Sequence, residues 1–232
     1  MARKIIIIFS LLLVVCMSLR SQNDDFGIWS SVEVAKKLKK IELNGEFEFR
    51  MQDNLQNIAR LSGKVGVEYR IIKPLKIGVA YQYIHFYDVE YSDYQPRNRF
   101  ITYLQGQQKW GNFNFSLRER VQLTTRDESD RIKSNGKIDT YKMNPDWIWR
   151  NRLKIEYDIP KCKITPAVSV ESFYQLNNPD GNAFEGMRYT LSGSYKLNKQ
   201  QSLELFGLYD KEMNVNNPEN RYVLGIAYIY SF

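Results

Sequence analysis

The one histidine of the chain, His85, is the first candidate for chemistry. A histidine can act as the base for a nucleophilic serine only when the hydroxyl lies within hydrogen-bond reach. The residue two positions further on is Tyr87, so a nucleophile would have to come from another strand, with Ser92 and Ser172 as candidates. A single histidine near a strand end is more typical of packing at an interface. The sequence therefore predicts no catalytic residue, and an acyl-hydrolysing or acyl-transferring enzyme remains the alternative.

Metal and cofactor chemistry has little support in the sequence. Residues 127–130 (Asp-Glu-Ser-Asp) and 177–182 (Asn-Asn-Pro-Asp-Gly-Asn) carry oxygen ligands of the kind that Ca²⁺ prefers. Neither segment has the spacing of a calcium loop, and the second has the composition of a turn. The two cysteines are Cys16, in the leader segment described below, and Cys162, which excludes an intramolecular disulfide after cleavage. We expect no metal and no cofactor.

Charged residues that recur at every second position form the main group of candidate site residues. Residues 41–51 place large apolar side chains on one face, and glutamates with an arginine on the other. Strict alternation of this kind is the signature of a β-strand. Charges of both signs that share the inside of a closed sheet are expected to pair, because an unpaired buried charge is costly. We expect a charge network in the lumen that includes Glu46, Glu48, Arg50, Glu68, Arg70, Arg118, Arg120, Arg150, Arg152, Glu156 and Arg188.

Alternation predicts the strands that must position these charges. They are expected at residues 26–35, 41–51, 61–71, 75–83, 97–109, 113–123, 147–158, 163–175, 186–197, 201–211 and 221–232. The connections alternate between short turns, at 72–74, 110–112, 159–162 and 197–201, and longer polar loops, at 88–96, 124–145, 176–182 and 212–220. Short turns at one end and long loops at the other are the layout of outer-membrane barrels. Aromatic residues gather near both sets of connections, as two interfacial belts would require.

The strand count is odd, whereas bacterial single-chain barrels have even numbers of strands. We therefore expect an all-β fold, a single antiparallel transmembrane up-and-down barrel of about ten strands, with twelve as the next choice. Residues 22–232 would form it, with both ends in the periplasm. The segment 26–35 would then not span, or a further strand would lie within 124–145. A soluble barrel or sandwich is the alternative, because alternation does not distinguish the inside from the outside.

The start of the chain predicts export. Arg3 and Lys4 precede an apolar run over residues 5–15, so residues 1–21 are predicted to be a cleaved secretory signal peptide. A lipid anchor on Cys16 is disfavoured because Val15 precedes it, where such a site needs a small residue.

Cleavage of the signal peptide would leave 30 basic and 26 acidic residues, a net charge of +4. That charge is too small to indicate nucleic acid as a partner, and the lysine-rich segment 36–40 is expected to be a turn at a membrane face.

The last strand carries large side chains on one face, up to the terminal aromatic residue. Tyr228, Tyr230 and Phe232 resemble the signal by which outer-membrane barrels are recognised for assembly. This resemblance implies the barrel assembly machinery as a partner and the cell outer membrane, with its lipid and lipopolysaccharide, as the location.

Several segments together resemble a known family. They are Ile28-Trp29, Lys37-Leu38-Lys39-Lys40, Glu46-Phe47-Glu48-Phe49-Arg50, Leu117-Arg118-Glu119-Arg120, Trp149-Arg150-Asn151-Arg152 and the aromatic C-terminus. They look like the domain-of-unknown-function family 2490 (DUF2490), small outer-membrane barrels of Gram-negative bacteria. The resemblance covers residues 22–232 and implies the fold and location, but no activity and no catalytic residue.

These observations predict a monomeric, non-enzymatic outer-membrane barrel: a narrow channel, or a structural or binding component with a charge-filled lumen. A lipid-modifying enzyme, such as a lipase or a lipid A acyl hydrolase or transferase, is the alternative. A third possibility is an adhesin-like role for loops 88–96 and 124–145.

Overall fold

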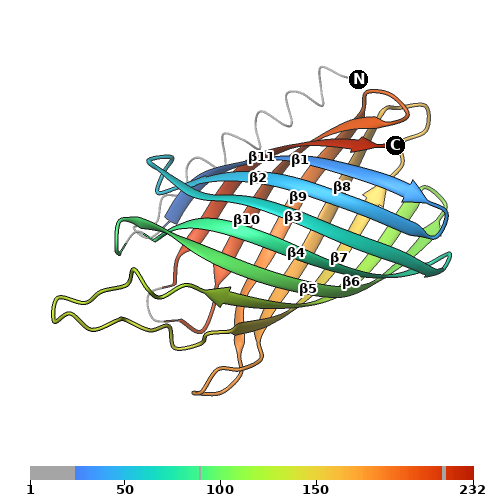
Figure 1. Cartoon of the computed structure of the whole chain (residues 1–232). Coiled ribbons are helices and arrows are strands. Elements are labelled where there is room, and N and C mark those ends of the chain that lie inside the picture. Colours follow the sequence, from blue (N-terminus) through green and yellow to red (C-terminus); the bar gives the residue numbers. More distant parts are fainter. Residues whose placement is uncertain (1–23, 89, 216–217) are drawn as a thin grey trace.

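The computed structural model describes residues 24–88, 90–215 and 218–232, and these residues form one closed barrel of eleven strands (Figure 1). The strands are β1 (Asp24–Leu38), β2 (Ile41–Gln52), β3 (Asn57–Ile72), β4 (Leu75–Asp88), β5 (Asp93–Trp110), β6 (Phe113–Arg126), β7 (Asp146–Tyr157), β8 (Ile164–Gln175), β9 (Phe184–Lys196), β10 (Gln201–Glu212) and β11 (Asn220–Ser231). The predicted signal peptide, residues 1–21, lies outside the described residues. The part of the chain that is described contains no helix long and apolar enough to cross a membrane.

Each strand pairs antiparallel with its neighbours in the sequence, as in an up-and-down barrel. The strands contain 12 to 18 residues. They therefore exceed the roughly 9–11 residues that a tilted strand needs to cross a bilayer, and Figure 1 shows that they are tilted to the barrel axis. The predicted all-β barrel is confirmed.

The strand number requires a correction, because the expected count of ten or twelve is wrong. Residues 26–35, for which a non-spanning segment was one of two alternatives, are part of β1, which pairs parallel with β11 from Asp24 opposite Asn220 to Ala35 opposite Ser231. The loop 127–145 adds no spanning strand, only an isolated bridge between Ile132 and Ile138. A β-strand exposes hydrogen-bonding groups on both edges, so its pattern of side chains does not specify whether a neighbour runs parallel or antiparallel.

Parallel closure places the two ends of the barrel chain at opposite ends of the barrel. Asp24 begins β1 beside Asn220, where the long loops are, whereas Phe232 follows β11 at the end with the short turns. The expectation that both ends share one side is therefore wrong for the residues that the structure describes. An odd number of strands makes this unavoidable, because the first and last strands then run in the same direction.

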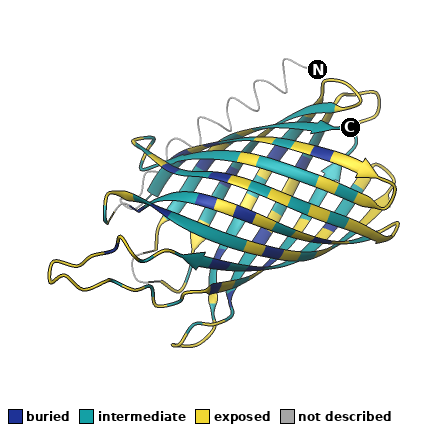
Figure 2. Cartoon of the chain, in the orientation of Figure 1, coloured by how far each residue is buried: buried dark blue, intermediate teal, exposed yellow. Residues whose placement is uncertain are grey.

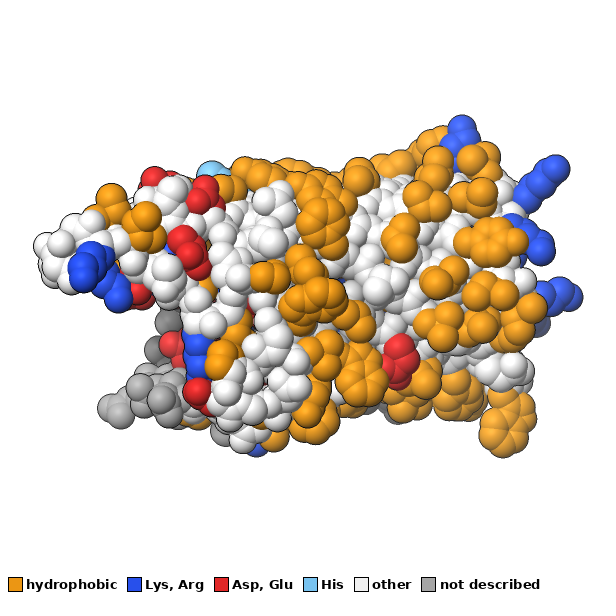
Figure 3. Space-filling view, turned by 60° about the horizontal axis from the view of Figure 1, so that its bottom comes forward, with side chains coloured by type: hydrophobic (Ala, Val, Ile, Leu, Met, Phe, Trp, Pro, Cys, Tyr) orange, Lys and Arg blue, Asp and Glu red, His pale blue; other side chains and the backbone are white. Residues whose placement is uncertain are grey.

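The barrel wall is apolar outside and polar inside. Exposed large side chains cover its outer face, among them Phe47, Val65, Phe100 and Leu205. Figure 2 shows exposed and buried residues along the strands, and Figure 3 shows hydrophobic side chains spread over the face of the wall in view. Buried positions face the lumen and are largely polar, among them Ser62, Gln82, Ser116, Gln122, Glu171 and Ser192. A soluble barrel has the opposite arrangement, so the structure decides between the two alternatives that alternation left open.

A small apolar cluster lies inside the barrel beside the parallel seam. It contains Trp29, Leu208 and Val223, with Phe206 packed against it. The guanidinium of Arg50 lies 3.5 Å from the centre of the Trp29 ring. Gly225 lies opposite Trp29, and a Cβ at Gly225 would stand 2.0 Å from the Phe206 ring, so the seam requires a glycine there. These contacts connect β1, β10 and β11 from within.

The connections differ at the two ends, as the sequence predicted. Short turns join β1 to β2 and β3 to β4, whereas the connection 127–145 between β6 and β7 is long (Figure 1). One expected loop is shorter than predicted, because residues 93–96 belong to β5. Exposed lysines stand in the short turns, among them Lys39, Lys73 and Lys161, and Figure 3 shows basic side chains projecting from that end.

Labelling of intact cells tests the orientation of this barrel. Because the long loops and the short turns are at opposite ends, an epitope inserted at residues 133–137 should be accessible from outside the cell. The same epitope inserted at residues 198–200 should become accessible only after the outer membrane is permeabilised. Surface labelling at 198–200 alone would show the reverse orientation.

A second prediction concerns Phe232, whose backbone extends the seam. Its amide donates to the Ala35 carbonyl at 2.9 Å, and its carbonyl accepts from the Lys37 amide at 3.2 Å. We expect Phe232→Asp to reduce the yield of heat-modifiable, membrane-inserted barrel. The matched control is Phe113→Asp, since Phe113 is 47% exposed and Phe232 is 48% exposed on the same outer surface. An equal loss in both variants would show that Phe232 acts only as one more apolar side chain.

Candidate functional site

The lumen contains the charged side chains that the sequence placed together, and the structure divides them into separate clusters. The first surrounds Glu48 on β2. Arg50 and Arg60 donate to its two carboxylate oxygens at 2.7 and 2.6 Å, and the Ser62 hydroxyl lies 3.3 Å from Oε1. The three charged side chains are 11–19% exposed. The Glu48 carboxylate thus connects β2 to β3 through Arg60, in a largely desolvated place where charge-assisted hydrogen bonds are strong.

The second cluster surrounds Glu171 on β8. Arg118 donates through Nη2 to Oε1 at 2.8 Å, and Arg150 donates through Nη2 to Oε2 at 2.8 Å and through Nε to Oε1 at 3.2 Å. Arg150 also donates to the side chain of Gln122 at 3.3 Å. Arg118 lies on β6, two strands away from Glu171. This carboxylate therefore ties three strands together along the inner wall.

The third cluster joins β9 and β10. Arg188 holds Asp210 with both arms of its guanidinium, Nε to Oδ1 at 2.5 Å and Nη2 to Oδ2 at 2.6 Å. The same guanidinium lies 5.0 Å from the ring centre of Trp29 and 5.3 Å from that of Phe173. A two-armed contact fixes the orientation as well as the position of both groups.

Acidic side chains dominate the part of the inner wall near the short turns. Glu33 stands directly opposite Glu46, and Glu42 directly opposite Glu68. Lysines offset part of this charge: Lys64 donates to Glu46, and Lys76 lies 2.5 Å from Glu68. The Tyr103 hydroxyl donates to the second oxygen of Glu68 at 2.5 Å.

A further acidic residue, Glu156 on β7, also has its partners nearby. It pairs with Lys154 at 2.8 Å and accepts from Asn114 at 2.7 Å. The lumen is thus divided into zones of opposite charge.

Three predicted members of the network stand apart from these clusters. Arg70 lies on the inward face at the end of β3 but is exposed at the rim, and no carboxylate pairs with it among the described residues. Arg120 and Arg152 face the lumen opposite Arg150 and Arg118, respectively. Neither of the two makes an ion pair within the described part of the chain.

Sequence reasoning missed several inward-facing partners. They are Arg60, Arg97, Arg99, Arg126, Asp146 and Asp210. Arg60 continues the alternating face of β3 by one further step beyond the predicted start of that strand. Arg97 and Arg99 lie in a strand whose alternation is weak because β5 carries few apolar residues on its outer face. Extending the alternating faces beyond the predicted strand ends would have found Arg60, Arg126 and Asp146, whereas Arg97, Arg99 and Asp210 lie within predicted strands.

The region between β6 and β7 forms a second polar cluster, at the long-loop end. Arg131 is buried there and donates to Asp88, to Asp139 Oδ2 at 3.0 Å and to the Tyr141 hydroxyl at 3.1 Å. Its guanidinium lies between the rings of Tyr91 and Tyr141, at 4.4 and 4.2 Å from their centres. The Tyr141 hydroxyl in turn donates to the buried Gln95 at 2.7 Å. Loop 127–145 is thus fastened to β4 through Arg131 and Tyr141, and to β5 through Tyr141.

Two groups of this cluster have shifted pKa values. Hydrogen bonds from Lys133 and then from Tyr91 lower the pKa of Asp139 to about 2. The hydrogen bond to the Asp139 carboxylate raises the pKa of the Tyr91 hydroxyl to about 12. The stabilising contribution of Asp139 is present above its ordinary value of 3.8 and is lost as the pH falls through about 2. The loop therefore keeps these contacts throughout the neutral range.

His85 stacks on an aromatic ring rather than contacting either candidate serine. The imidazole stacks on the Tyr94 ring, with 4.5 Å between the ring centres and 4° between the planes. The Ser172 hydroxyl accepts from Asn151 at 3.3 Å, and no hydrogen bond joins either candidate serine to His85 in the described segments. The same residues contain no group of three His, Cys, Asp or Glu side chains suited to a metal ion.

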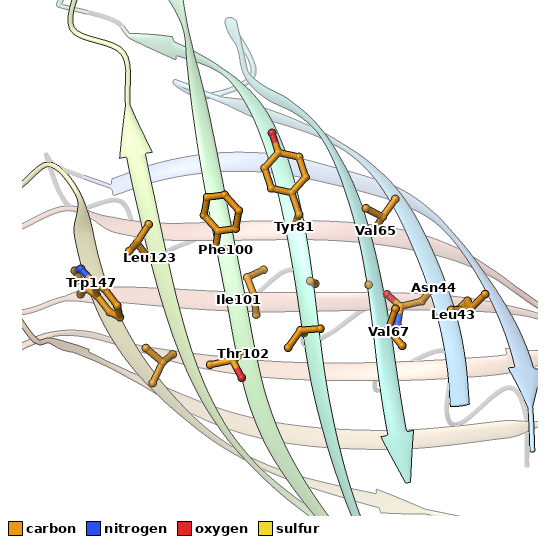
Figure 4. A pocket seen from close by; sticks show the side chains of 14 residues that line it. Leu43, Asn44, Val65, Val67, Tyr81, Phe100, Ile101, Thr102, Leu123 and Trp147 are labelled. Atoms are coloured by element: carbon orange, nitrogen blue, oxygen red, sulfur yellow. The ribbon is translucent and has the colours of Figure 1, made fainter. Parts of the chain in front are cut away.

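A groove of about 840 Å³ lies on the outer wall. Val65, Tyr81, Phe100, Leu123 and Trp147 stand around it (Figure 4). No acidic, basic or histidine side chain lines it. It is a surface for apolar contact, and the polar chemistry of the molecule is inside the lumen and at the loop end.

A closed sheet with an apolar exterior and a charged lumen is the architecture of outer-membrane β-barrels, and solved structures show the same fold. The chain superimposes on the β domain of the Bordetella autotransporter BrkA with a TM-score of 0.52 at 11% identity, covering 85% of this chain and 86% of that one. A bacterial polysaccharide outer membrane secretin gives a TM-score of 0.50 at 11% identity, covering 81% and 73%, respectively. At such identities the likeness shows the fold alone.

The family is decided by sequence. Residues 26–228 match the family described as protein of unknown function (DUF2490), and the chain belongs to it. The resemblance inferred from the motifs is therefore confirmed. Among curated proteins, none matches this chain in sequence.

The loop cluster yields a prediction about Arg131. Arg131→Ala would leave Asp88 without its arginine partner and remove a cation from between two aromatic rings, so the loop should detach while the barrel stays closed. We expect cleavage of loop 127–145 by added protease to accelerate roughly tenfold, the scale of one lost charge-assisted hydrogen bond. The control is Lys142→Ala, which removes an exposed ion pair with Asp180 from the same loop. Equal cleavage rates in the two variants would contradict the role of Arg131.

Proposed function

We propose that this chain is a non-enzymatic protein of the outer membrane whose lumen is closed to free ion flow by a network of paired charges. It would serve as a structural or binding component, or as a channel of very small conductance. The observation that carries the proposal is the bridging of strands by single carboxylates: Glu48 joins β2 to β3, and Glu171 joins β6, β7 and β8.

Barrel size supports a filled lumen. Side chains just fill a barrel of eight strands, and open aqueous channels appear at about 16–18 strands. A barrel of eleven strands lies nearer the filled limit. Long arginine and glutamate side chains on its inner wall are therefore expected to reach across much of the interior, with little room for a continuous water column.

The outer surface supports membrane residence. Its apolar belt offers contact to lipid chains, and aromatic groups such as the pairs Trp149–Tyr174 and Phe113–Tyr157 lie near opposite ends of the wall. Such belts suit the two interfaces of a bilayer. We propose lipid and lipopolysaccharide as the surrounding partners, the barrel assembly machinery as the insertion partner, and a monomer as the working unit.

Planar-bilayer recording tests the closed lumen. We expect the wild-type protein to give small or no conductance with little ion selectivity. Arg150→Ala combined with Arg152→Ala removes two long side chains from the inner face of β7 and should raise the conductance. The control, Lys109→Ala with Asp158→Ala, removes an exposed ion pair at the short-turn end and should leave it unchanged. A large, stable wild-type conductance that the inner double substitution does not alter would contradict the proposal.

A further inference from the structure

Arginines face arginines across neighbouring strands of the lumen wall. The directly opposed pairs are Arg50 with Arg60, Arg97 with Arg126, Arg120 with Arg150, and Arg118 with Arg152. Side chains directly opposite each other in an antiparallel sheet have Cβ atoms about 5 Å apart, and like charges in such pairs are destabilising. A wall that contains four such pairs needs negative charge close by.

Carboxylates supply only part of that charge. Glu48 is shared between Arg50 and Arg60, and Glu171 is shared between Arg118 and Arg150. Asp146 pairs with Arg126 at 2.5 Å. Arg97 makes no ion pair among the described residues, but its guanidinium lies 3.5 Å from the ring centre of Phe86. One carboxylate therefore serves the block of four arginines on β6 and β7, which retains an excess of positive charge.

Arg99 on β5 and Arg120 on β6 are two of the four inward-facing arginines of β5–β7 that make no ion pair in the described part of the chain, together with Arg97 and Arg152. Arg99 donates one hydrogen bond, from Nε to the Thr124 hydroxyl at 3.0 Å, and Arg120 has a buried Nε without any partner. The charges that act most strongly on Arg99 are other arginines, and those on Arg120 are Arg150, Arg118 and Arg99, ahead of Glu171. Both face the lumen and are only half-buried, so water-sized space adjoins them inside the barrel.

We propose that Arg99 and Arg120, with Arg118 and Arg150 beside them, form a binding site for a small phosphate-type oxyanion inside the lumen. A guanidinium presents a planar fork of N–H donors that matches the oxygens of a phosphate group. An anion there would offset the like charges and pair the free donors, since a buried donor without a partner is costly. This site rests on the proposed function in one respect, because a narrow lumen is what brings arginines of several strands around one ligand.

Cations and apolar ligands fit this place poorly. The acidic zone of the lumen, with Glu33, Glu46 and Glu68, lies on β1–β3 near the short turns, whereas Arg99 lies on β5 and Arg120 on β6. The arginine zone therefore attracts anions, and its lining offers hydrogen-bond donors in excess of acceptors. Multiple guanidinium groups favour an oxyanion over chloride, because several oxygens can each accept.

Calorimetric titration of the full chain, refolded in detergent, with inorganic phosphate tests the site. We expect saturable binding to the wild-type protein at constant ionic strength, and binding at least roughly tenfold weaker in Arg99→Gln/Arg120→Gln, since hydrogen bonds to charged groups are lost. Arg221→Gln is the control, because Arg221 lies at the loop end and pairs with Asp25 at 2.9 Å. Arg120→Lys keeps the charge without the fork, so a folded barrel with intermediate affinity would support the site.

Two outcomes would overturn the inference. One is the absence of saturable phosphate binding to the wild-type barrel, and the other is equal affinity in the double variant and in Arg221→Gln. Heat-modifiable mobility of each variant shows whether it is folded. The result is independent of the conductance test, because an anion can bind in an open pore and a closed lumen can lack the site.

Discussion

Closure of the sheet is the constraint on which the rest of this structure depends. In a lipid environment every backbone N–H and C=O of a strand needs a partner within the protein, so a sheet must have no free edge. Here eleven strands meet that requirement by a parallel pairing of β1 with β11. The seam is reinforced from inside by Trp29 and Val223 and continued beyond β11 by the backbone of Phe232. Closure also places the first and last strands in the same direction.

Closure with an apolar exterior leaves the polar side chains no place but the lumen. Charges that would be solvated on a soluble protein then stand within a confined space, where each must find a partner. The outcome is uneven. Glu48 and Asp210 are fully engaged with arginines, Glu171 serves two, and the acidic zone near the short turns depends on lysines. On β5–β7 the arginines outnumber the carboxylates that pair with them, so this part of the inner wall carries an excess of positive charge.

The loop end is held by side-chain contacts, whereas the wall is held by backbone pairing between strands. Backbone hydrogen bonds join residues 131–139 of loop 127–145 to one another, and Asp127 joins the start of the loop to Pro96. Beyond Asp127, side chains hold the loop to the wall. Arg131 provides this by reaching three partners and two aromatic faces at once. Its partners come from β4, from the segment before β5 and from the loop itself, which makes the position of the loop dependent on the barrel wall beneath it.

The sequence by itself determined which residues of each strand share a face, because alternation is a local property that successive residues already display. The closed barrel then decided that the charged face is the inner one. Glu48 and Arg50 on β2, and Arg150 and Arg152 on β7, face the lumen as their spacing predicted. Strand number, parallel closure and charge pairing were decided only by the tertiary structure. Arg152 stands opposite Glu171 in register, yet Glu171 binds Arg118 and Arg150. Such choices depend on the register and tilt of strands far apart in the chain, and on side-chain reach across a curved wall, which no local pattern encodes.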